Sequence, residues 1–110
     1  MTTPIQPILL VRHDASLANV DPRVYVTMPD HVIPLAENDS PRVRIAADHV
    51  RALDLDPRTT CSWCSPYVRC RQTEESVLRL AFGDGAERIV RRESFLLRKQ
   101  DFGDWDSFGA

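Results

Sequence analysis

Short apolar runs alternate with amphipathic stretches along this chain. Residues 8–11 read Ile-Leu-Leu-Val, a continuous apolar run typical of a strand buried on both faces of a parallel sheet. Ser40 and Pro41 are good N-cap and first-turn residues, and the apolar positions that follow them at helical spacing predict a helix that ends near Asp54. Residues 59–64 are rich in β-branched, aromatic and cysteine side chains, so they predict a second strand.

The second half of the chain repeats this alternation. Ser65 and Pro66 predict the start of another helix, whose apolar stripe ends at Gly83. Ile89 and Val90 predict a third, short strand. The order strand, helix, strand, helix predicts an α/β fold with a small, mainly parallel sheet flanked by helices.

Two stretches lack this periodicity. Residues 20–41 contain four prolines separated by polar residues, which predicts a long, ordered surface loop. Residues 95–105 form an irregular aromatic stretch. Because long loops in small domains often carry function, the first of these stretches is a candidate functional segment.

Composition and charge narrow the class of protein. The 110 residues fit one small domain, 1–110, and 14 basic against 16 acidic residues argue against a nucleic-acid partner. The apolar run near the N-terminus is too short for a signal peptide or a membrane span. Three cysteines are an odd number and do not suggest a disulfide framework. We therefore expect a cytoplasmic protein without a membrane partner.

Cys61 and Cys64 have the spacing of redox or zinc sites, and Cys70 follows them. In an extended strand, however, residues three apart point to opposite faces, so the first two thiols should not converge. We therefore expect the cysteines to pack in the core.

Polar residues follow both strong strands at the point where each strand should end. Arg12 and His13 end the first strand, and Ser65 and Arg69 follow the second. Ligands of open α/β sheets bind at the carboxyl ends of the strands. A cation in the first turn of a helix is disfavoured by the helix dipole unless an anion lies between them. Two arginines beside a helix N-terminus therefore predict a phosphate site.

Four segments of the chain form an ordered set of motifs. They are LVRHDAS at residues 10–16, followed by Asn19, PDHVIPL at 29–35, SPYVRCRQT at 65–73 and LRKQDFG at 97–103. In this order they resemble the opening motif, the loop after it, the second signature and a third segment of the histidine phosphatase superfamily, which includes the phosphoglycerate mutases. The resemblance covers nearly the whole chain and implies a partial phosphoglycerate mutase-like three-layer fold.

The resemblance also implies a phosphohistidine mechanism on a small phosphorylated metabolite, without metal or other cofactor. It assigns catalytic roles to His13, Arg12 and Arg69, and substrate-binding roles to Ser16, Asn19 and Lys99. In this mechanism the neutral imidazole attacks phosphorus and the guanidinium groups hold the phosphoryl oxygens.

The chain departs from the family pattern at several site positions. Asp14 replaces the glycine after the nucleophile, and Ala15 replaces the usual acid. Lys99 stands where the third segment normally carries the glutamate that protonates the leaving group. Asp39 and Arg42 replace the usual glycine and glutamine.

The chain ends at Ala110, just after the third segment, and we expect it to lack the C-terminal part that carries the family's second histidine. Two functions stay open. One is a phosphatase or mutase. The other is a catalytically degenerate relative that binds phospholigands or other proteins. A homo-oligomer or a complementary subunit would cover the sheet that the missing part leaves open.

Overall fold

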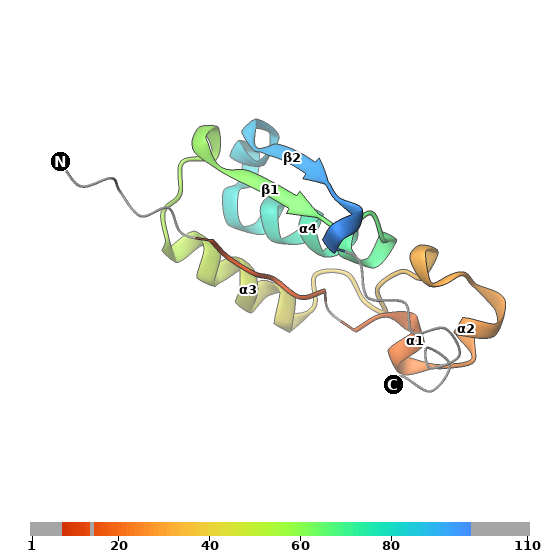
Figure 1. Ribbon diagram of the computed structural model, residues 1–110. Helices are drawn as coiled ribbons and strands as arrows, with labels where there is room; N and C mark the ends of the chain where they lie inside the picture. Colours follow the sequence, from red (N-terminus) through yellow and green to blue (C-terminus); the bar gives the residue numbers. More distant parts are fainter. Residues whose placement is uncertain (1–7, 14, 98–110) are drawn as a thin grey trace.

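The computed structural model describes residues 8–13 and 15–97 (Figure 1). Its regular elements, in chain order, are α1 (Leu17–Val20), α2 (Val24–Thr27), η1 (Asp30–Val32), α3 (Pro41–Ala52), η2 (Pro57–Thr59), β1 (Cys61–Cys64), α4 (Val68–Phe82), η3 (Gly83–Arg88), β2 (Val90–Glu93) and η4 (Phe95–Leu97). The elements labelled η are short 3₁₀-helices.

The sheet is a parallel pair of strands joined by a helical crossover. Strands β1 and β2 run in register from Cys61 opposite Val90 to Cys64 opposite Glu93. Helix α4 and the 3₁₀ turn η3 connect them, and Figure 1 shows α4 lying along the pair. Parallel strands require a crossover of this kind because a tight turn cannot bring the second strand back in the same direction. The predicted α/β fold with a small parallel sheet is confirmed.

The apolar core lies between α3 and α4. Val43 and Val50 of α3 are buried against Val77 of α4. The predicted start of α3 is confirmed, because the Ser40 hydroxyl accepts a hydrogen bond from the Val43 amide at 3.2 Å. Pro41 occupies the first turn, where its missing N–H leaves no intrahelical bond unmade.

Helix α4 begins later than the sequence pattern predicts. The prediction placed the N-cap at Ser65, whereas the helix starts at Val68 with Tyr67 as N-cap. Ser65 forms a local turn in which its hydroxyl accepts a hydrogen bond from the Tyr67 amide at 3.3 Å. Serine side chains satisfy turn amides and helix caps by the same kind of bond, so the pattern alone does not separate the two. The predicted end is confirmed, because Gly83 caps the helix at a φ of 56°.

The prediction of a buried strand at residues 8–11 is wrong. This segment is not part of a strand, and Ile8 and Leu10 are 87% and 94% exposed. Among the described residues, β1 forms its ladder with β2 alone. A strand requires hydrogen bonds to a neighbour, and an apolar run cannot supply that neighbour.

The predicted loop at 20–41 is ordered, but it carries two short helical elements, α2 and η1. Its middle part, residues 29–35, pairs with residues 16 and 17 and is called the strap below. Ser16 and Leu35 form an antiparallel bridge, and Leu17 donates a main-chain hydrogen bond to Pro34 at 3.0 Å. Ile33, at the centre of the strap, is fully buried.

The side of the sheet that faces away from α4 is open. Ser62 faces the helix, because its hydroxyl bonds to Glu74, and alternation places Cys61 and Trp63 on the other side. Val90 and Arg92 lie beside them on β2. We call these four exposed residues the open face.

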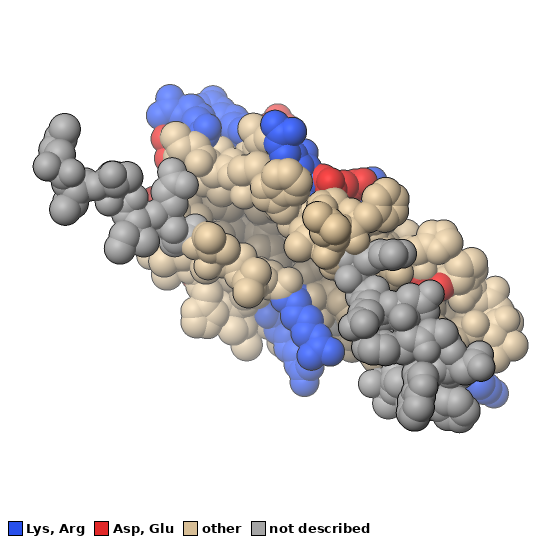
Figure 2. Space-filling model, viewed as in Figure 1, with Lys and Arg blue, Asp and Glu red and all other residues tan. Residues whose placement is uncertain are grey.

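Figure 2 shows few charged side chains across the middle of the view, where β1 and residues 8–13 run, and basic side chains near β2. The prediction that the cysteines pack in the core holds for Cys64, which is buried, and is wrong for Cys61, which is exposed on the open face. Within the described part of the chain, no helix has the length and apolar character needed to cross a membrane.

Candidate active site

The centre of the candidate site is a buried arginine. Arg69 is the second residue of α4 and only 4% exposed. Its Nη1 donates to the main-chain oxygen of Asp30 at 2.7 Å and forms an ion pair with the Asp30 carboxylate at 3.0 Å. The guanidinium carbon lies 4.9 Å from the centre of the Tyr67 ring. The carboxylate offsets both the desolvation of the guanidinium and its repulsion by the helix N-terminus.

His13 reaches the same guanidinium from the start of the chain. Its Nε2 accepts a hydrogen bond from Arg69 Nε at 3.3 Å, although the two residues are 56 positions apart. An imidazole nitrogen that accepts a hydrogen bond carries a lone pair, so this contact requires the neutral ring with its proton on Nδ1. The structure therefore brings together two of the residues expected from the sequence, even though no strand forms before His13.

Ser16 and Asn19 are hydrogen-bonded to each other. The Ser16 amide and hydroxyl both donate to Asn19 Oδ1, at 2.8 and 3.1 Å. These bonds close the first turn of α1, and Ser16 is buried beneath the strap. Their visible role is to fix the turn that follows His13.

The remaining expected residues are not in this contact. Arg12 is exposed on the segment that precedes His13. Asp14 and Lys99 lie outside the described residues.

The sequence reasoning did not single out Asp30 or Tyr67, the residues that hold Arg69. Both lie inside segments that carry the family resemblance, PDHVIPL and SPYVRCRQT, and that was the available signal. Gln72 completes the arrangement, because its side-chain oxygen accepts from the Leu35 amide at 2.8 Å and ties the strap to α4. His31 adds an edge-on ring contact to Tyr67, with ring centres 6.5 Å apart.

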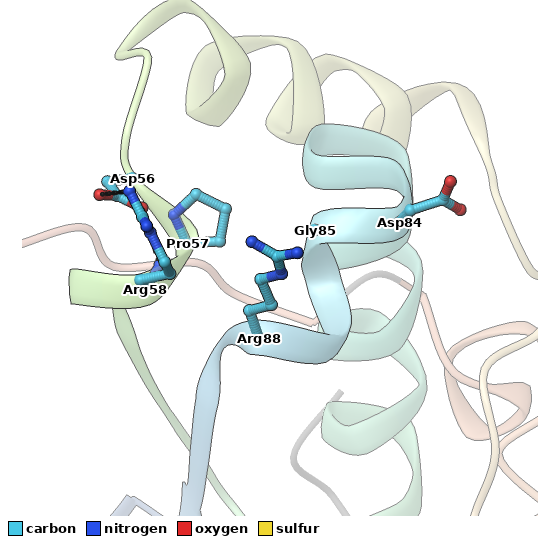
Figure 3. A pocket seen from close by; sticks show the side chains of 6 residues that line it. All are labelled: Asp56, Pro57, Arg58, Asp84, Gly85 and Arg88. Carbon is cyan, nitrogen blue, oxygen red and sulfur yellow. Dashed lines mark hydrogen bonds and ion pairs between the residues drawn. The ribbon is translucent and has the colours of Figure 1, made fainter.

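Two surface hollows lie away from His13 and Arg69. One, of about 890 Å³, runs along α4 and β2, and its charges largely pair with one another, as Arg91 does with Glu74 and Glu75. The other, of about 390 Å³, lies between η2 and η3. Figure 3 shows Arg88 beside Pro57 in this hollow, with the Asp84 side chain directed away.

Burial disfavours the reactive thiolate form of two of the three cysteines. Burial, helped by the nearby Glu74 carboxylate, raises the pKa of the Cys64 thiol to about 12. Burial also raises the pKa of Cys70. The thiolate is the nucleophile and the metal ligand, so these two cysteines are inert near neutral pH.

Comparisons with known proteins point to the same family as the motifs. The chain is 36% identical over 107 residues to the phosphoglycerate mutase-like protein AT74H of Arabidopsis thaliana, and 33% identical over 104 residues to the phosphoglycerate mutase-like protein AT74 of the same plant. Each match covers 89% of this chain. The chain spans only 37% and 32% of the lengths of these curated relatives.

No family model matches the chain, and no solved structure matches it. The chain is a member of the phosphoglycerate mutase-like group of the histidine phosphatase superfamily and corresponds to an N-terminal part of that fold.

Proposed function

We propose that the protein transfers phosphoryl groups from a small phosphorylated metabolite through a phosphohistidine at His13. The observation that carries this proposal is the contact between His13 Nε2 and the buried Arg69 guanidinium. It puts a nucleophile with a lone pair beside a fixed cation, which is what phosphoryl transfer requires of a protein.

In the proposed reaction a phosphoryl oxygen takes over the hydrogen bond that Arg69 Nε now gives to His13. This exchange frees the lone pair on Nε2, which forms a bond to phosphorus as the bond to the leaving oxygen breaks. In this proposal the negative charge on the equatorial oxygens is held by Arg69 together with Arg12, the residue before His13. Water then takes the phosphoryl group from His13 in a phosphatase, or a second hydroxyl takes it in a mutase.

The leaving oxygen needs a proton unless it is already a stable anion. The family's glutamate is replaced by Lys99, which with an ordinary pKa near 10.4 is poorly matched to donate a proton near neutrality. The proposal therefore favours phosphate esters of acidic alcohols, such as aryl phosphates, over alkyl phosphates.

A second candidate function is a catalytically degenerate module that binds phospholigands or other proteins. The Asp30 carboxylate favours it, because it already neutralises Arg69, and so do the substitutions at Asp14 and Lys99. Loss of one member of a catalytic group typically costs orders of magnitude in rate. A module of this kind would bind phosphate without turnover.

The test is incubation of the full chain with a radiolabelled aryl phosphate, followed by trapping of acid-labile, base-stable phosphoprotein. The enzyme predicts label that is absent from His13→Ala and present in His49→Ala, whose imidazole lies on the exposed surface of α3. Label that survives His13→Ala excludes His13 as the nucleophile. Stabilisation by phosphate that is absent from Arg69→Ala, without any label, supports the binding module.

We also propose that the protein is cytoplasmic and that another chain covers the open face. Three cysteines that form no disulfide are compatible with a cytoplasmic location. The open face is compatible with a homo-oligomer or a complementary subunit, which the native mass of the purified chain will test.

A further inference from the structure

The three nitrogens of the Arg69 guanidinium differ in their hydrogen-bond partners. Nη1 donates one hydrogen bond, to the main-chain oxygen of Asp30, and forms an ion pair with the Asp30 carboxylate, and Nε donates to His13. Among residues 8–13 and 15–97, nothing accepts a hydrogen bond from Nη2. This leaves one nitrogen with donor capacity, on a side chain that is 5% exposed, next to the candidate nucleophile.

Because a guanidinium is planar, the directions of its N–H groups depend on one another. When Nη1 is held at two points, the plane can no longer rotate, and the directions of Nε and Nη2 follow. The main-chain oxygen and the carboxylate of Asp30, one residue of the strap, therefore decide which N–H faces His13. The strap itself is held in place by the buried Ile33 and by the bond from Leu35 to Gln72.

We propose that Asp30 is a positioning residue for Arg69, which aims Nε at His13, leaves Nη2 for a phosphoryl oxygen, and weakens anion binding through its own charge. This inference rests on the proposed function, because it assumes that the anion bound at Arg69 is a phosphoryl group. Asp30 touches neither the phosphoryl group nor the reacting nitrogen in this scheme, and acts through Arg69 alone.

Two substitutions separate the orientation of Arg69 by Asp30 from the effect of the Asp30 charge on anion binding. Asp30→Asn keeps a side-chain oxygen beside Nη1 but removes the negative charge. Asp30→Ala removes both the side-chain oxygens and the charge, and leaves only the main-chain oxygen to hold Nη1. A residue with a purely structural role would not tighten phosphate binding in either variant.

The first readout is the dissociation constant for inorganic phosphate, measured by calorimetry on the full chain. At low ionic strength Asp30→Asn should bind phosphate at least about tenfold more tightly than the unmodified protein, because a carboxylate near the bound anion is gone. The gain should shrink as salt is added. Asp39→Asn is the matched control, since that carboxylate pairs with Arg79 on the surface, and it should change the constant less than twofold.

The second readout is the nitrogen NMR signal of the His13 imidazole, which reports the hydrogen bond from Arg69 without any turnover. The signal should move in Asp30→Ala, where the guanidinium can rotate, and stay near its original position in Asp30→Asn. His31→Asn and His49→Asn spectra assign it.

Phosphate binding by Asp30→Asn that is unchanged or weaker overturns the inference, and so does an unmoved His13 signal in Asp30→Ala. If Asp30→Ala does not fold, the binding comparison with Asp30→Asn decides. Failure of the proposed function looks different, because it is an absence of phosphohistidine in the unmodified protein and leaves both readouts measurable.

Discussion

The strap with Arg69 and the open face of the sheet follow opposite rules of burial. At the strap a charged guanidinium is 4% exposed and is met by a carboxylate, a carbonyl, an aromatic ring and an imidazole. On the open face Trp63 is 59% exposed and Val90 is 49% exposed. One region hides charge, and the other presents apolar surface to solvent.

The contrast shows where the structure is tightly specified. A buried charge is tolerated only when partners with good geometry surround it, so few arrangements of the strap are allowed. Exposed apolar side chains carry no comparable penalty for moving. The region around the buried Arg69 is also the region that holds the candidate nucleophile, His13.

Loss of the buried cation should have the largest effect on stability. Arg69→Met removes the cation that pairs with the buried end of the Asp30 carboxylate, and we expect the free energy of unfolding to fall by about 3 to 5 kcal/mol. The measurement is urea unfolding followed by circular dichroism. Asp30→Leu in the same chain should recover part of this loss, because an apolar pair needs no charge compensation. A loss below about 1 kcal/mol would contradict the burial argument.

A matched pair of apolar truncations tests the same contrast without charges. Ile33→Ala should lower the free energy of unfolding by about 3 kcal/mol, because it leaves a cavity under the strap. Trp63→Ala removes more atoms, but from the open face, and should stay within about 0.5 kcal/mol. Equal losses in the two variants would mean that the open face is packed in solution.

Cys64, the last residue of β1, makes the free energy of unfolding depend on pH. Burial raises the pKa of Cys64 from 9.0 to about 12, so the unfolded chain releases this proton first as pH rises. The contribution to stability is complete below pH 9 and is lost between pH 9 and about 12. The decline stays below the one-proton limit of about 1.4 kcal/mol per pH unit. Between pH 9 and about 12, the free energy of unfolding should change less with pH in Cys64→Ala than in Cys61→Ala. The Cys61 thiol serves as the control because it is exposed in the native protein.

The smallest effect should come from the ion pair that resembles the buried one but lies at the surface. Arg79 binds Asp39, and hydrogen bonds from Ser76 and Arg79 hold the pKa of that carboxyl below its ordinary value. Because solvent screens this pair, Arg79→Ala should shift the urea midpoint by a small fraction of the shift in Arg69→Met. Similar shifts would show that burial does not distinguish the two pairs.

Prediction from the sequence was most successful where the signal was local. The cap at Ser40 and the stop at Gly83 follow from residue types that act on their own neighbours. The prediction at residues 8–11 is wrong because an apolar run does not provide the neighbouring strand that it needs. The start of α4 moved by two residues because Ser65 serves a turn as readily as a cap.

By itself the sequence determined the strand–helix–strand order of the second half of the chain, the family and the presence of His13 and Arg69 among its motifs. Only the tertiary structure decided that Asp30 holds Arg69 and that Ser16 and Asn19 bond to each other. The physical reason is that local propensities depend on a few adjacent residues. The partner of a buried charge is whichever group the fold brings close, here across 39 positions of chain.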